Sequence, residues 1–197
     1  MTAKRKAVFL DRDGVLIDDV GFLAEPAQVK WCPNVKEGLA RLRELGFLNV
    51  ITSNQSGVAR GFFSMDDVAS VHAHMLRTLG VTDLAAGLVN GIHFCPHLPD
   101  GRVHQYSIEC ECRKPKPGLI LKAAAEHDVD VARSYLIGDA IRDLEAGRAA
   151  GVKKTVLVLT GKGREVQYRT PNPPQADFVA PDLLAAAQWI AGQEKAS

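Results

Sequence analysis

The sequence predicts an α/β fold, a three-layer sandwich in which a mostly parallel sheet lies between helices. Short apolar runs of strand length alternate with helical patterns about ten residues long. Two of these runs end at an aspartate. The chain has 197 residues, of which 46% are apolar and 24% charged, so it can bury a core of ordinary size. We therefore expect one domain that spans residues 1–197.

The first strand is expected at residues 7–10, four consecutive apolar residues bounded by charge. Such a run is typical of a strand that is buried on both faces of a parallel sheet. Asp11 and Asp13 follow it, and both carboxylates can reach one point before Gly14 turns the backbone, because side chains two apart on an extended chain point the same way. Paired carboxylates suit Mg²⁺, which prefers oxygen ligands. The alternative is a polar turn, since Asp and Gly are favoured in turns.

The later elements alternate in the same way. Further strands are expected at residues 47–52, 91–94, 134–138, 155–159 and 178–179. Helices are expected at residues 35–45, 64–79, 117–127, 141–150 and 181–190. Ser64 begins a pattern that resembles a capping box, Pro117 suits a first helical turn, and Gly46 and Gly151 suit helix ends. Residues 15–33, and residues 161–176 with their three prolines, are expected to form loops.

Polar residues follow several of the predicted strands. Ser53 comes after the second strand and Asp139 after the fourth, and ligands of parallel sheets bind where the carboxyl ends of strands meet. Asp143, one helical turn beyond Asp139, is interpreted as a solvated acid at a helix start, with the orientation of a metal-bound water as its alternative role. His72 and His74 face different sides of their predicted helix, so we interpret them as packing or surface residues.

A second cluster lies in one loop, at about residues 95–112. Cys95, His97, Cys110 and Cys112 form a closed set of four ligands of the kind that structural Zn²⁺ takes. His104 is the competing ligand within this loop. A zinc ion would staple a long loop that has no core of its own. Chance clustering of reduced thiols is the alternative, and Cys32 stands apart as an ordinary thiol.

The charge distribution limits the partners. The formal net charge is +1, which provides no broad field for nucleic acid or for an anionic membrane. The apolar run after the basic N-terminus is too short for a secretory signal, and no later run approaches the length of a membrane span. We therefore expect a cytoplasmic protein with small-molecule partners, no nucleic acid and no membrane. Nothing marks a large apolar surface, so a monomer is expected.

Four motifs together resemble, in the same order, those of haloacid-dehalogenase-type phosphatases. They are D-R-D-G at residues 11–14, the hydroxyl of Ser53, Lys114 in R-K-P-K-P-G, and G-D at residues 138–139. The resemblance implies a haloacid-dehalogenase-like fold with a Rossmann-like sheet and no large cap domain. It also implies that Mg²⁺ is bound by Asp11, the main chain of Asp13, and Asp139.

The same resemblance assigns catalytic roles. It makes Asp11 the nucleophile that forms an aspartyl phosphate. Asp13 would protonate the leaving alkoxide and then take a proton from the attacking water. Lys114 would place its charge on the phosphoryl oxygens, and Ser53 would donate a hydrogen bond to them. Because a halide leaves without a proton, an acid at Asp13 favours phosphate esters as substrates.

The zinc loop narrows the resemblance to the subgroup of heptose-bisphosphate and histidinol-phosphate phosphatases. Residues 52–61, T-S-N-Q-S-G-V-A-R-G, and the long spacer between His97 and Cys110 look more like the heptose enzymes. The resemblance implies hydrolysis of the C7 phosphate of D-glycero-D-manno-heptose 1,7-bisphosphate, for bacterial surface-glycan (lipopolysaccharide) synthesis. The implied substrate-binding residues are Asp19, Gly21, Ser53, Asn54, Gln55, Ser56, Arg113 and Lys114. Among these, Arg113 would bind the second phosphate.

Two alternatives remain open from the sequence. One is a histidinol-phosphate phosphatase, because the zinc loop and the motifs resemble that part of the subgroup too. Ala140 stands where the heptose enzymes often have lysine, and this removes one expected substrate contact. The other is a non-catalytic phospho-aspartate switch, because receiver domains also combine an aspartate with Mg²⁺, a hydroxyl and a lysine. An acid at Asp13 argues against the switch, since it would shorten the lifetime of the acyl phosphate.

Overall fold

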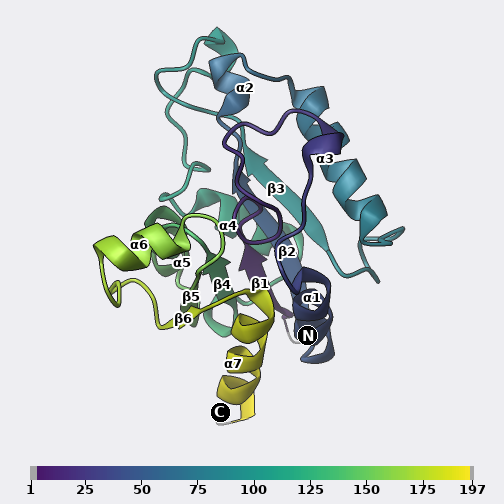
Figure 1. Ribbon diagram of the computed structural model, residues 1–197, viewed down its shortest axis with the longest axis vertical. Helices are drawn as coiled ribbons and strands as arrows, with labels where there is room; N and C mark the ends of the chain where they lie inside the picture. Colours follow the sequence, from purple (N-terminus) through teal and green to yellow (C-terminus); the bar gives the residue numbers. More distant parts are fainter. Residues whose placement is uncertain (1–3, 196–197) are drawn as a thin grey trace.

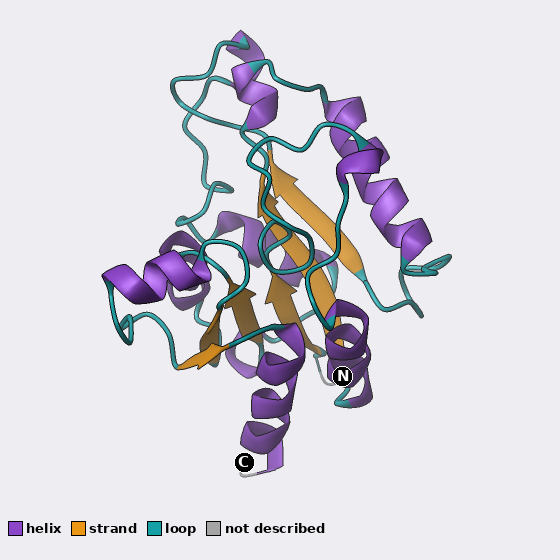
Figure 2. Cartoon of the chain, viewed as in Figure 1, coloured by secondary structure: helices purple, strands orange, loops and turns teal. Residues whose placement is uncertain are grey.

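The computed structural model describes residues 4–195. One parallel sheet forms the centre, with its strands in the order β3-β2-β1-β4-β5-β6 (Figures 1 and 2). The strands are β1 (Lys6–Leu10), β2 (Phe47–Asn54), β3 (Gly91–Cys95), β4 (Tyr135–Gly138), β5 (Lys154–Val158) and β6 (Phe178–Ala180). All six strands expected from the sequence are confirmed. The strand arrows in Figure 2 point toward the end of the molecule that carries the short helix α2 (Gly57–Arg60) and the long loops.

Alternate residues of β1 enter two separate cores. Val8 and Leu10 belong to one apolar cluster, and Ala7 and Phe9 belong to the other. The first core receives side chains from α1 (Val35–Glu44), α3 (Met65–Thr78) and α7 (Leu183–Lys195). The second receives them from α4 (Gly118–Glu126) and α5 (Ile141–Ala150). These two cores confirm the predicted three layers.

The helix α6 (Gly163–Arg169) corrects the sequence analysis, which interpreted residues 161–176 as a loop. Val166 packs against the second core, and Glu165 forms an ion pair with Arg169 one turn later, at 2.6 Å. The backbone N–H of Lys162, just before this helix, donates to Asp139 Oδ2 at 2.8 Å. A few tertiary contacts therefore stabilise a short helix that its own apolar pattern does not predict.

The carboxyl ends of β1 and β4 meet where the first acids lie. The Asp11 N–H donates to the carbonyl of Ile137 at 3.0 Å, so pairing between the two segments continues past the end of β1. Gly14 follows with φ +81°, and a Cβ at this position would collide with the carboxylate of Asp139. Glycine is thus required where the chain passes over Asp139. Among the described residues, no helix is both long and apolar enough to cross a membrane.

Candidate active site

Three aspartates converge beneath the ends of β1 and β4. Asp11, Asp139 and Asp143 are buried, and their ligand oxygens all lie within 4.8 Å of one another. The interpretation of Asp143 as a solvated acid is wrong. The start of α5 turns its side chain inward, where it accepts a hydrogen bond from the Ala140 N–H at 3.1 Å and lies 2.7 Å from Lys114 Nζ.

The electrostatics of this cluster suit a cation. Burial, together with the nearby charges of Asp11 and Asp143, raises the pKa of Asp139 to about 7. Asp139 Oδ1 is buried without a hydrogen-bond partner among the described residues. A hard divalent cation would supply that missing partner and relieve the repulsion between the acids. The donor set therefore fits Mg²⁺, although the Asp13 carboxylate does not belong to this cluster.

Lys114 is buried below the acids and uses its ammonium group fully. Its Nζ lies 3.0 Å from Asp11 Oδ1 and 2.7 Å from Asp143 Oδ1, and it donates to the carbonyl of Thr52 at 2.8 Å. Burial opposes protonation, but Asp11 and Asp143 outweigh it, so the pKa of Lys114 is raised. The side chain of Asn54 holds the Lys114 backbone through both its N–H and its carbonyl. Lys114 therefore stabilises the negative charge of Asp11 from the protein interior, since Lys114 itself does not line the cavity.

Asp13 faces a different set of groups. The buried guanidinium of Arg12 donates to Asp13 Oδ1 at 2.8 Å, and Gln55 Nε2 donates to Asp13 Oδ2 at 2.9 Å. Gln55 also donates to Ser53 Oγ at 2.8 Å, and Ser53 Oγ lies 3.5 Å from the same Asp13 oxygen. The Asp13 carboxylate is therefore held in one orientation beside the Ser53 hydroxyl.

A cavity of about 320 Å³ opens above these residues. It is lined by Asp11, Asp13, Asp19, Gly21, Phe22, Ser53, Asn54, Gln55, Ser56, Gly57, Arg60, Phe63, Arg113, Arg142 and Lys162. Every predicted substrate-binding residue except Lys114 lies on its wall. At its rim, Asp19 pairs with Lys162 at 2.5 Å. Burial would raise the pKa of Asp19, but the hydrogen bonds from Lys162 and from the Gly21 N–H outweigh it and lower that pKa.

Sequence reasoning missed three cationic residues of the cavity. Arg60 lies inside the T-S-N-Q-S-G-V-A-R-G motif, but only its first polar residues were assigned a role. Arg142 immediately precedes Asp143, and no sequence pattern marks it as a binding residue. Lys162 immediately precedes α6, in the segment interpreted as a loop. Only the tertiary fold brings these residues to one cavity.

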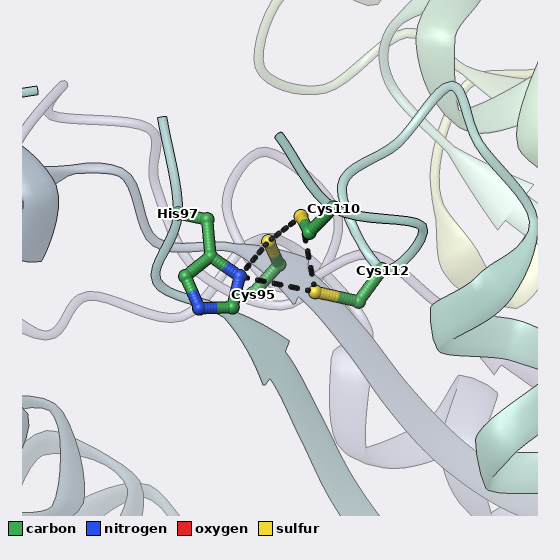
Figure 3. A group of neighbouring side chains, drawn as sticks. All are labelled: Cys95, His97, Cys110 and Cys112. Carbon is green, nitrogen blue, oxygen red and sulfur yellow. Dashed lines mark hydrogen bonds between the residues drawn. The ribbon is translucent and has the colours of Figure 1, made fainter. Parts of the chain in front are cut away.

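Cys95, His97, Cys110 and Cys112 point toward one another at the end of β3 (Figure 3). Adjacent donors are 3.4–3.7 Å apart, the separation of ligands that share a tetrahedral metal ion. Burial and neighbouring thiols raise the pKa of Cys95. The four donors fit Zn²⁺, and His104 does not belong to the group. Cys32 lies apart, and burial together with Asp18 raises its pKa to about 12.

The sheet, the acids at its carboxyl edge and the buried lysine define a haloacid-dehalogenase-like hydrolase. A HAD-hydrolase-like family model matches residues 111–186. A D-glycero-beta-D-manno-heptose-1,7-bisphosphate 7-phosphatase from Yersinia pestis is 43% identical over 82% of this chain and 85% of its own. The enzyme of the same name from Pasteurella multocida is 42% identical over 95% of this chain and 98% of its own. The chain therefore belongs to the family of these phosphatases.

A solved structure agrees with this assignment. The D,D-heptose 1,7-bisphosphate phosphatase from B. bronchiseptica, complexed with magnesium and phosphate, has a TM-score of 0.82 and 35% identity to this chain. The alignment covers 95% of this chain and 99% of that one. The predicted family and fold are thereby confirmed.

Proposed function

We propose that this protein is a Mg²⁺-dependent phosphatase that removes the C7 phosphate of D-glycero-D-manno-heptose 1,7-bisphosphate. The observation that carries the proposal is the position of Asp11. Its carboxylate is buried against Lys114 and belongs to the cluster that fits a cation, yet it lines a cavity of about 320 Å³. The activity for which the relatives are named supports the choice of substrate.

Asp11 attacks the phosphorus, the bond to the sugar oxygen breaks, and an aspartyl phosphate forms. Asp13 gives a proton to the departing alkoxide and then removes one from the water that hydrolyses the aspartyl phosphate. Gln55 supports this role by fixing the Asp13 carboxylate. Lys114 holds Asp11 and opposes the negative charge that develops beside it.

Asp11, Asp139 and the main chain of Asp13 would hold Mg²⁺, with Asp143 as a further acid of the cluster. The cation supplies positive charge to neutralise the phosphoryl oxygens during transfer. The polar segment Ser53, Asn54, Gln55 and Ser56 binds the transferred group, and Asp19 and Gly21 contact the sugar. Arg113 binds the second phosphate. Zn²⁺ at the four-ligand cluster positions the loop, within a single domain of residues 1–197.

Phosphate release from heptose 1,7-bisphosphate, measured with and without Mg²⁺, tests the proposal. We expect turnover that requires Mg²⁺ and yields the 1-phosphate. Asp11→Asn should abolish turnover, and Asp13→Asn should reduce kcat by about 10²–10⁴-fold. Clear preference for histidinol phosphate would contradict the choice of substrate. Stoichiometric trapping of phosphate by the wild type, without release, would contradict the enzyme.

A further inference from the structure

Three arginines from separate segments reach the wall of the same cavity. Arg60 ends α2, Arg113 follows the last cysteine of the zinc loop, and Arg142 lies in the first turn of α5. All three line one cavity at the carboxyl edge of the sheet. Three guanidinium groups facing one space repel each other unless an anion lies between them.

Within residues 4–195, none of the three side chains forms an ion pair with a carboxylate. Arg113 Nη1 donates only to the carbonyl of His97, at 3.1 Å. Arg60 lies over the ring of Phe22 at 5.7 Å, and its buried Nε has no hydrogen-bond partner among the described residues. Arg142 is exposed to the cavity and makes no side-chain hydrogen bond in the described part of the chain. Guanidinium donors are thus left free to bind a ligand.

The acids that line the cavity are already paired with other lysine and arginine side chains. Asp11 is paired with Lys114 at 3.0 Å, Asp13 with Arg12 at 2.8 Å, and Asp19 with Lys162 at 2.5 Å. In each pair, a cation of the protein itself balances the carboxylate. The three arginines therefore carry the surplus positive charge of the cavity.

We propose that Arg60 and Arg142 complete, with Arg113, a subsite for the phosphate that is not transferred. Guanidinium groups bind phosphate oxygens in pairs, and three of them match a dianion. This inference rests on the proposed function, since it takes the second phosphate of a bisphosphate as the ligand. It makes Arg60 and Arg142 specificity-determining residues.

The test compares two substrates, heptose 1,7-bisphosphate and heptose 7-phosphate, in wild type, Arg60→Ala and Arg142→Ala. We expect each variant to lose about 10- to 100-fold in kcat/KM toward the bisphosphate, mainly through KM. Toward the 7-phosphate the same variants should change less than about threefold, because no second phosphate is present. Arg142→Lys, which keeps the charge, should recover part of the loss.

Arg164→Ala is the matched control, because Arg164 is an exposed arginine of α6 outside the cavity. It should behave as wild type on both substrates. Equal losses on both substrates in Arg60→Ala and Arg142→Ala would overturn the subsite while leaving the phosphatase activity established. If the wild type hydrolyses neither heptose 1,7-bisphosphate nor heptose 7-phosphate, the proposed function itself is overturned. Titration of the 1-phosphate product into each variant gives a binding readout that does not depend on turnover, and unchanged affinity would also overturn the subsite.

Discussion

The buried guanidinium of Arg12 connects the acid Asp13 to the histidine of a neighbouring helix. Arg12 is 1% exposed, and its Nη1 lies 3.3 Å from His72 Nε2. The ring of His72 also packs edge-on against Phe94. Burial, with the charge of Arg12 as a second cause, lowers the pKa of His72 to about 3. The interpretation of His72 as a packing residue is therefore confirmed, and it has a consequence for acid stability.

A lowered histidine pKa makes stability fall in acid. Below pH 6.5, the ordinary value, the unfolded chain binds a proton at His72, whereas the folded chain stays neutral until about pH 3. The contribution of His72 to folding is therefore lost as the pH falls from 6.5 toward 3. We expect His72→Gln, which cannot titrate, to reduce the loss of unfolding free energy between pH 7 and pH 5 by roughly 2 kcal/mol. Urea denaturation of both proteins at pH 7 and at pH 5 measures these unfolding free energies.

His74→Gln is the control for this prediction, because His74 lies on the same helix but is less buried. It should keep the acid sensitivity of the wild type. If His72→Gln and the wild type lose the same unfolding free energy between the two pH values, His72 does not carry the effect.

Asp143 shows what the sequence could not reveal about a single residue. Its position after a strand end predicts a helix-start acid, but only the fold shows that Lys114, 29 positions earlier in the chain, lies 2.7 Å away. Burial raises the pKa of Asp143, and Asp11 raises it further, while Lys114 opposes both. Sequence spacing predicts neighbours within one helix or strand, and this pair crosses from a loop to a helix.

Removing the charge of Asp143 should weaken the cation site. Asp143→Asn keeps the shape but takes one acid from the cluster, so we expect about 10- to 100-fold weaker activation by Mg²⁺. The concentration of Mg²⁺ that gives half-maximal phosphate release measures the change. Glu145→Gln, on the same helix but outside the cluster, should leave that concentration unaltered. Unchanged Mg²⁺ activation in Asp143→Asn would exclude Asp143 from the site.

At the scale of elements, the four-donor cluster was predictable because its members come in two closely spaced pairs, Cys95 with His97 and Cys110 with Cys112. The helix α6 was not, because Val166 finds its packing partners only in the folded core. The bounds of most helices were predicted to within a few residues, since capping signals such as that of Ser64 act locally. Ser64 accepts a hydrogen bond from the Asp67 N–H, as its sequence pattern predicts.

The zinc loop should control activity through the residues that follow it. Cys112 is adjacent to Arg113 and Lys114, so losing the metal would release both side chains from the site. We expect the wild type to contain about one zinc ion per chain and Cys112→Ala to contain almost none. The variant should also lose about tenfold or more in kcat/KM, because small misplacements of positioning groups are costly.

Metal content by atomic emission and phosphate release measure these two effects. Cys32→Ala is the control, since Cys32 is a buried thiol outside the four-ligand cluster. It should retain zinc and activity. Full activity in a zinc-free Cys112→Ala protein would show that the loop holds its position without the ion.

For the whole molecule, the alternation of apolar strand-length runs with helical patterns predicted the three-layer sandwich, because both faces of a parallel sheet must be covered. The strand order could not be predicted with the same ease, since it depends on which crossovers pack best. The C-terminal helix α7 illustrates this limit. It packs beside α1, and Glu194 near its end reaches the start of the sheet at Lys6. Nothing local in the sequence connects residues 188 positions apart.

Glu194 ties α7 to β1, β4 and the start of β5, and this link should set part of the global stability. It accepts hydrogen bonds from Lys6 at 2.7 Å, from Tyr135 at 2.8 Å and from Lys153 at 2.9 Å. Burial would raise the pKa of Glu194, but these hydrogen bonds outweigh it and lower the pKa from 4.5 to about 2. Glu194→Gln should therefore lower the free energy of unfolding at pH 7 by about 1 kcal/mol, because the site is partly exposed to solvent.

The pH dependence separates this link from simple packing. A carboxylate with a lowered pKa stabilises the fold above the unfolded value, 4.5, and that contribution disappears as the pH falls toward 2. The difference in unfolding free energy between the wild type and Glu194→Gln should thus be full at pH 7 and smaller at pH 3. Glu37→Gln, an exposed acid on α1, should show no difference at either pH. A Glu194 difference that stays constant down to pH 3 would mean that side-chain shape, and not charge, holds α7 to the sheet.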